Sequence, residues 1–108
     1  MYYVYMLRCG DNSIYTGITT DVKRRMEEHF SKAPKCAKYT KSHKPKKLEC
    51  VWESENKVLA SKLEFRIKAL TKAQKEELIK NHALEKYFAE KLECDKYKIV
   101  KNIDKTSI

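Results

Sequence analysis

Five side chains between residues 5 and 64 have the chemistry to act on a phosphate ester. They combine two phenols, a guanidinium, an imidazole and a carboxylate, and they are Tyr5, Tyr15, Arg25, His29 and Glu64. The planar guanidinium of arginine can hold a phosphate through several N–H donors at once. Histidine changes its charge near neutral pH, and a carboxylate suits a hard cation such as Mg²⁺. One divalent metal and an arginine can together stabilise the charge that develops during phosphodiester cleavage.

Each of these residues also has an ordinary structural explanation. Composition alone favours Tyr5 and Tyr15 as core aromatics. Glu64 with Lys68 at i+4 is a common pair on a helix surface, and Arg25 fits a solvated basic face equally well. His29 is equally consistent with a half-buried histidine that has only a structural role.

A β-hairpin is predicted to position the two tyrosines. Residues 2–9 and 13–19 are rich in β-branched and aromatic residues, and the Gly-Asp-Asn sequence at residues 10–12 is typical of a turn. A three-residue loop places Tyr5 and Tyr15 on the same face of the sheet, whereas a two-residue loop places them on opposite faces. A shared site requires the three-residue loop. The first strand is apolar on both faces, which predicts a central position.

A helix over residues 21–30 is predicted to carry the arginine and the histidine. Its apolar stripe has i, i+4, i+8 spacing and is formed by Val22, Met26 and Phe30. Arg25 and His29 flank this stripe on a helical wheel, so both can approach the sheet.

The rest of the chain predicts one more strand and two more helices. Residues 48–53 alternate as a strand, with Leu48, Cys50 and Trp52 expected on one face. Apolar spacing predicts a helix over residues 57–70, with Leu59, Leu63, Ile67 and Leu70 facing inward.

A capping box at residues 71–74 begins the second of these helices, which runs to about residue 80. The pattern after residue 81 is partly helical, and the last dozen residues form a short strand or a frayed end. The expected fold is α+β, a central antiparallel three-stranded sheet flanked by helices in the order β-β-α-β-α-α.

Length and charge bound the function. The 108 residues fit one domain, and the formal net charge of +9 attracts polyanions such as nucleic acid. Residues 32–47 hold seven lysines and no acidic residue. The expected nucleic-acid contacts are Gly17, Lys38, Tyr39, Lys41, Lys44, Lys46 and Lys47. A solvated loop, or a docking site for an acidic protein, is the alternative for this segment.

Cysteine spacing and hydropathy indicate the compartment. The four cysteines form no Cys-x-x-Cys pair, so neither a zinc ribbon nor a thioredoxin-like motif is indicated. The longest apolar run, residues 2–7, is too short for a signal-peptide core or a membrane span. We therefore expect a cytoplasmic protein without a membrane partner.

These residues, taken in order, resemble the GIY-YIG nuclease superfamily, including its small stand-alone bacterial proteins and the N-terminal domain of the excision-repair incision enzyme. Tyr-Val-Tyr at residues 3–5 stands where the family has Gly-Ile-Tyr, and Tyr-Thr-Gly at residues 15–17 where it has Tyr-Ile-Gly. Arg25 and His29 follow at the family spacing. Residues 61–68 resemble the helix that carries the metal-binding glutamate. Both tyrosines are present although the first glycine and the second isoleucine are replaced.

The resemblance implies a GIY-YIG endonuclease fold over residues 1–80, with residues 81–108 as a C-terminal extension of unassigned role. It implies a metal-dependent endonuclease that hydrolyses DNA phosphodiester bonds in DNA repair or recombination. The alternative is a nucleic-acid-binding module with the same fold and no catalysis.

The resemblance also implies a role for each candidate residue. Glu64 binds Mg²⁺ or Mn²⁺, and Arg25 holds the scissile phosphate. Tyr5 acts as general base on the attacking water, and Tyr15 hydrogen-bonds near the phosphate. His29 is a proton shuttle or a phosphate donor.

Overall fold

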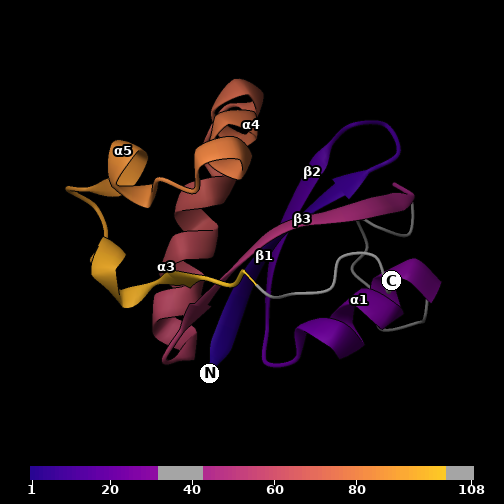
Figure 1. The fold of residues 1–108 in the computed structure, drawn as a ribbon, viewed down its shortest axis with the longest axis horizontal. Helices are drawn as coiled ribbons and strands as arrows, with labels where there is room; N and C mark the ends of the chain where they lie inside the picture. Colours follow the sequence, from indigo (N-terminus) through magenta and orange to yellow (C-terminus); the bar gives the residue numbers. More distant parts are fainter. Residues whose placement is uncertain (32–42, 102–108) are drawn as a thin grey trace.

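The computed structural model describes residues 1–31 and 43–101, which form an antiparallel sheet with helices on both faces (Figure 1). The strand order is β2-β1-β3-β4. The strands are β1 (Tyr2–Cys9), β2 (Ile14–Thr19), β3 (Pro45–Ser54) and β4 (Lys98–Ile99). The helices are α1 (Val22–Ser31), α3 (Lys57–Lys68), α4 (Lys72–Asn81), α5 (Leu84–Phe88) and the 3₁₀ turn η1 (Cys94–Lys96). No helix among the described residues is both long and apolar enough to cross a membrane.

The β1–β2 hairpin closes through a three-residue loop, which confirms the prediction. The Cys9 N–H donates to the Ser13 carbonyl at 2.9 Å, and the Asn12 N–H donates to the Cys9 carbonyl at 2.9 Å. Asn12 has φ of 70°, the left-handed conformation that such loops require at this position. Tyr5 pairs with Gly17 across the two strands. The resulting register places Tyr5 and Tyr15 on the same face.

Strand β1 is the centre of the sheet and is buried from both sides. One face carries Val4 and Met6 and packs under α3, α4 and α5. The opposite face carries Tyr5 and Leu7 and packs against α1 through Met26. The apolar character of both faces is therefore explained by two cores, one on each side of the sheet (Figure 1).

Strand β3 differs from the predicted alternation. Leu48 pairs with Leu7 in the core under α1, whereas Cys50 pairs with Met6 in the core under α3. A register shift between Met6 and Leu7 adds one residue, Glu49, to the β3 side of the pairing. The prediction that Leu48, Cys50 and Trp52 share a face was therefore wrong for Leu48, because a β-bulge changes the side on which a residue points.

The helices begin where the sequence predicts. Asn56 caps α3 by accepting a hydrogen bond from the Leu59 N–H at 2.9 Å. Thr71 and Gln74 form the predicted capping box at the start of α4. Helix α3 ends at Lys68, two residues earlier than expected.

The segment after α4 packs on the same core as residues 1–80. Leu84 and Phe88 of α5 are buried against α3, and the Tyr97 hydroxyl donates to the Leu59 carbonyl at 2.6 Å. The Val100 N–H donates to the Val51 carbonyl at 2.8 Å, next to β4. Strand β4 extends the expected three-stranded sheet to four strands, and it lies in the segment for which a short strand was one expectation.

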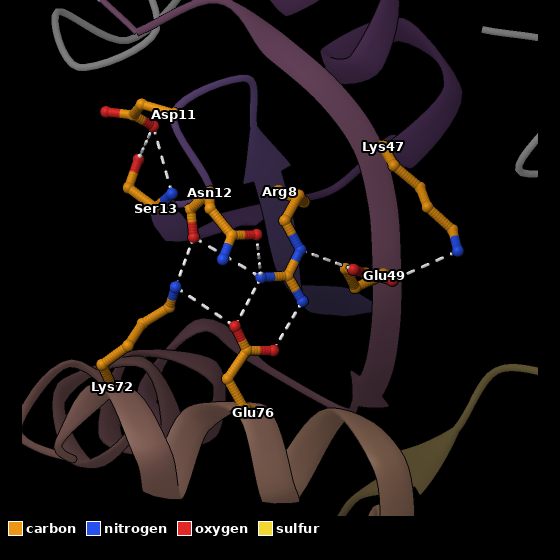
Figure 2. A network of polar contacts seen from close by, with 8 residues as sticks. All are labelled: Arg8, Asp11, Asn12, Ser13, Lys47, Glu49, Lys72 and Glu76. Carbon is orange, nitrogen blue, oxygen red and sulfur yellow. Dashed lines mark hydrogen bonds and ion pairs between the residues drawn. The ribbon is translucent and has the colours of Figure 1, made fainter.

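A polar network around Arg8 joins the hairpin to β3 and α4 (Figure 2). Arg8 Nε lies 2.8 Å from Glu49 Oε2, and its two terminal nitrogens lie 2.5 and 2.6 Å from the Glu76 carboxylate. Arg8 also donates to Asn12 Oδ1 at 3.1 Å, and Lys72 donates to the Asn12 carbonyl. The fork of Arg8 lowers the pKa of Glu76 to about 2.

Candidate active site

A buried hydrogen bond between Tyr5 and His29 forms the centre of the site. Tyr5 Oη lies 2.8 Å from His29 Nε2, and neither residue is exposed to solvent. Tyr5 comes from the central strand, and α1 places His29 opposite it. The predicted approach of His29 to the sheet is confirmed, and the residue is fully rather than half buried.

Burial keeps this pair uncharged at neutral pH. It raises the pKa of the Tyr5 phenol well above its usual value near 10, with the nearby Tyr15 adding to the rise and the positive charge of Arg25 opposing it. Burial and the charge of Arg25 lower the pKa of His29 to about 4. The sequence-based mechanism requires a lowered pKa for a tyrosine base, and burial does the reverse. A neutral His29 can accept a hydrogen bond from the Tyr5 hydroxyl, but its low pKa opposes full transfer of the Tyr5 proton.

Tyr15 completes a cluster of three rings. Its ring centroid lies 6.1 Å from that of Tyr5 and 5.6 Å from that of His29. Tyr15 is half-buried, so it forms part of the surface of the cluster.

Gly17 lies directly beneath two of these rings. A Cβ at this position would lie 2.6 Å from Tyr5 Oη and 3.0 Å from Tyr15 Cε2. The missing side chain therefore lets the two phenols pack over β2. The sequence predicts Gly17 as a nucleic-acid contact, and this stays a prediction. The pairing of Gly17 with Tyr5 is regular.

Arg25 borders the ring cluster from α1. It is half-buried, and its Nη1 lies 2.9 Å from Glu28 Oε1. Burial acts against its charge, but hydrogen bonds with Glu28 and Tyr5 outweigh that effect and raise the pKa of Arg25. A permanent positive charge therefore lies beside the buried phenol.

Glu64 lies on α3, on the opposite face of the sheet from the ring cluster. Lys68 connects the two, because it lies near both Glu64 and Tyr15. Lys68 Nζ lies 3.4 Å from Glu64 Oε2 and 5.9 Å from the centre of the Tyr15 ring. The Glu64 side chain is 23% exposed, so its carboxylate contacts solvent. The sequence analysis treated Lys68 only as the helical partner of Glu64, because its contact with Tyr15 depends on the tertiary fold.

One carboxylate is a donor set that fits Mg²⁺. Among residues 1–31 and 43–101, no three His, Cys, Asp or Glu side chains gather as a metal site. A zinc centre needs three or four such ligands. Mg²⁺ keeps several waters and binds through one or two carboxylates. Glu64, as a single carboxylate, therefore fits this ion.

The expected nucleic-acid contacts are described only in part. Lys38, Tyr39 and Lys41 lie outside the described residues. Lys44, Lys46 and Lys47 are exposed, at and just before the start of β3. The Gly10 N–H donates to the Lys44 carbonyl at 2.7 Å, which places this basic segment next to the hairpin loop.

Two tyrosines lie on a hairpin, an arginine and a histidine on the next helix, and a glutamate on a later helix. This arrangement defines a class of protein. The family model described as "GIY-YIG catalytic domain" matches residues 1–77. The chain belongs to the GIY-YIG family.

Within this family the chain is similar to UPF0213 proteins. A UPF0213 protein of Fusobacterium nucleatum is 51% identical over 78 residues, which cover 72% of this chain and 76% of that protein. A UPF0213 protein of Halobacterium salinarum is 45% identical over 78 residues, 72% of this chain and 99% of the relative. The solution NMR structure of a UPF0213 protein from Bacillus halodurans has 38% identity and a TM-score of 0.49, and covers 86% of this chain and 98% of that one.

Proposed function

We propose that this protein is a Mg²⁺-dependent endonuclease that hydrolyses DNA phosphodiester bonds. The buried hydrogen bond between Tyr5 and His29 carries the proposal, because it pairs a phenol with a neutral imidazole beside the cationic Arg25. Perturbed pKa values cluster at functional sites, so a buried phenol and imidazole beside a partly buried cation mark a candidate active site. Membership of a nuclease family supports the same conclusion.

Arg25 and Tyr15 are the groups that would meet the scissile phosphate. Both are half-buried, whereas Tyr5 and His29 are closed off from solvent. The guanidinium of Arg25 would exchange its contact with Glu28 for phosphate oxygens, and its fork geometry suits that exchange. The Tyr15 hydroxyl would hydrogen-bond near the same phosphate.

Tyr5 and His29 would handle the proton of the attacking water, which requires the half-buried Tyr15 to move and admit water to the Tyr5 hydroxyl. Tyr5 enters the reaction as a phenol, because burial raises its pKa. It can accept a proton from water only if its own proton passes to His29 Nε2, which lies 2.8 Å away, and this transfer requires the negative charge of the bound phosphate to raise the pKa of His29. The charge of Arg25 favours any negative charge that develops on the Tyr5 oxygen in this transfer.

Glu64 would hold the metal ion. Mg²⁺, when bound there, neutralises charge on the phosphoryl oxygens and on the leaving oxygen. Lys68 pairs with Glu64 at 3.4 Å. Lys68 would turn away from the carboxylate and stay near the substrate's negative charge.

A nucleic-acid-binding module without catalysis is the second candidate. The ion pairs of Arg25 with Glu28 and of Glu64 with Lys68 favour it, because both proposed catalytic groups already have a partner. The net charge of +9 supports nucleic-acid binding in either case.

Cleavage of a panel of labelled nucleic acids separates the two candidates. Linear, nicked, flapped and branched DNAs and an RNA are incubated with Mg²⁺ or Mn²⁺ and with wild type, Glu64→Gln or Glu85→Gln. Glu85 is an exposed glutamate of α5 and serves as the matched control. We expect wild type and Glu85→Gln to cut DNA and Glu64→Gln to bind without cutting. Binding without cleavage by all three proteins would support the module, and cleavage by Glu64→Gln would reject the metal site.

A further inference from the structure

A groove with an apolar floor lies on the outer side of α3, away from the sheet. It has a volume of about 560 Å³ and is bordered by α3 and by the segment that follows α5. Val58, Phe65 and Leu92 supply its apolar surface. Val58 is 63% exposed and Phe65 is 66% exposed, so this surface is open to solvent. A volume of this size is typical of ligand-binding sites.

The charged side chains of the groove all have the same sign. Lys57, Lys62, Arg66 and Lys91 line it, and no carboxylate from the described part of the chain is among its lining residues. The Arg66 guanidinium carbon lies 5.5 Å from the centre of the Phe65 ring. The groove therefore combines an exposed aromatic ring with several cations, which suits a ligand that is both anionic and flat.

We propose that this groove binds an unpaired nucleotide within a single-stranded stretch of nucleic acid. A base would stack on Phe65, and the neighbouring phosphates would contact Lys57, Lys62 and Arg66. A duplex cannot use the groove in this way, because the faces of its bases are stacked inside and only the base edges and the backbone are exposed. Stacking on an aromatic side chain between cations is how single strands are held without sequence preference.

The groove and Glu64, the proposed metal ligand, lie on neighbouring faces of α3. Glu64 directly precedes Phe65, and successive residues of a helix are about 100° apart around its axis. Ala60, Leu63 and Ile67 are buried, so Phe65 lies on the outer face of α3 and Glu64 on its flank. The proposal thus rests on the proposed nuclease function when it names the substrate, a nucleic acid with a single-stranded part beside the cut.

An acidic peptide is the alternative ligand for this groove, but nearby carboxylates restrict where such a peptide could lie. A second cavity of about 320 Å³ adjoins the groove at Leu92 and is lined in part by Glu90 and Glu93. A continuous acidic chain that left the groove on this side would meet two carboxylates. The same carboxylates limit the path of a nucleic-acid strand, so the proposed nucleotide site is confined to the basic part of the groove around Phe65.

Binding measured in the presence of a chelator tests the proposal apart from cleavage. Fluorescence anisotropy compares a labelled single-stranded oligonucleotide with a blunt duplex of equal length. Phe65→Ala is expected to weaken single-strand binding about tenfold, which matches the loss of one stacked base. Phe65→Trp is expected to retain it, and duplex binding is expected to stay within twofold for both variants.

Charge variants complete the test. Lys62→Gln is compared with Lys98→Gln, which removes the same charge from an exposed position in β4. Only Lys62→Gln is expected to affect single strands more than duplex. The proposal is overturned if Phe65→Ala leaves single-strand binding unchanged, or weakens duplex binding equally. It is also overturned if a labelled poly-glutamate peptide binds the wild type more tightly than the single strand does and loses affinity in Phe65→Ala.

The test separates two failures. If wild type cuts none of the substrates but Phe65→Ala still weakens single-strand binding selectively, the nuclease function fails and the groove remains a nucleotide site. If Glu64→Gln abolishes cleavage but Phe65→Ala has no selective effect, the nuclease function remains and the groove assignment fails.

Discussion

Tyr5 and His29 meet in a space where water does not reach either side chain. Each is a group that titrates in solution, and each is held neutral by the cost of placing charge in a packed core. At the scale of the residue, the stability of the folded protein therefore depends on pH, and this dependence can be measured.

The pH dependence of stability is expected to reveal His29. Its pKa is about 4 in the folded protein and near 6.5 in an unfolded chain. The unfolded state therefore binds a proton first as pH falls, so the folded state loses stability between pH 6.5 and 4 and is unaffected above that range. The loss attributable to this residue is about 3 kcal/mol. Urea denaturation at several pH values measures it.

The variant His29→Gln provides the control for this measurement. It keeps a polar side chain beside Tyr5 and removes the titrating group, so its stability is expected to change much less over the same pH interval. An equal slope in the variant would show that other groups cause the pH dependence.

Gly17 is expected to tolerate no side chain. In Gly17→Ala the new Cβ would lie 2.6 Å from Tyr5 Oη, and the buried Tyr5 ring has no free space to enter. The ring must move away from His29, and we expect a loss of roughly 2 kcal/mol in unfolding free energy together with loss of cleavage. Chemical denaturation measures the first effect. Gly10→Ala is the control, because a Cβ there lies no closer than 3.6 Å to the Lys44 carbonyl oxygen. Equal losses in the two variants would contradict the explanation.

At the scale of the element, Arg8 connects three separate parts of the chain (Figure 2). Arg8→Met would leave the carboxylate of Glu49, only 11% exposed, without its guanidinium. We expect a destabilisation of about 2 kcal/mol, since Glu49 and Glu76 would both lose their guanidinium partner while Glu49 stays largely buried. Thermal or urea unfolding provides the measurement.

Lys47→Met is the matched control for the Arg8 variant. Lys47 pairs with the same glutamate at 3.6 Å but is itself 59% exposed. An exposed ion pair contributes little, so its loss is expected to change stability by less than about 0.5 kcal/mol. Similar effects of both substitutions would argue against a special role for Arg8.

Local patterns were sufficient to predict most elements. The turn residues 10–12, the stripe at Val22 and Met26, and the Thr71 capping box depend on neighbours in sequence, and the structure has each of them. The hairpin loop length in turn gave the shared face of Tyr5 and Tyr15.

Long-range contacts were not predictable from the same patterns. The bulge at Glu49 depends on how β3 pairs with β1, and it reversed the expected side of Leu48. The contact of Lys68 with Tyr15 and the groove around Phe65 depend on where α3 lies on the sheet. Arg8 was not singled out from the sequence, because its partners Glu49 and Glu76 are distant from it along the chain.

At the scale of the whole molecule, salt is expected to control binding to DNA. The excess of positive charge means that binding releases counterions from the phosphates, so log K falls linearly with log salt. Replacing Lys44, Lys46 and Lys47 together by glutamine is expected to reduce this slope by about 3. Affinity measured at several salt concentrations gives the slope.

A control variant removes the same charge elsewhere. Lys80, Lys96 and Lys98 are exposed and are distant in sequence from the basic segment. Their joint replacement by glutamine is expected to change the slope by less than 1. Equal changes would show that DNA responds to net charge alone and not to the segment before β3.

The central position of β1 has a consequence for the time at which the protein can fold during its synthesis. This strand is synthesised before its second partner, β3, which is complete only when Ser54 has been added. Until then one edge of β1 and much of its apolar surface lack their final cover, and such exposed strands favour aggregation. Glu64 and Lys68 emerge later still. The candidate active site is therefore completed only after α3 has been synthesised, and fragments of the chain that stop before α3 are expected to be substrates for proteases.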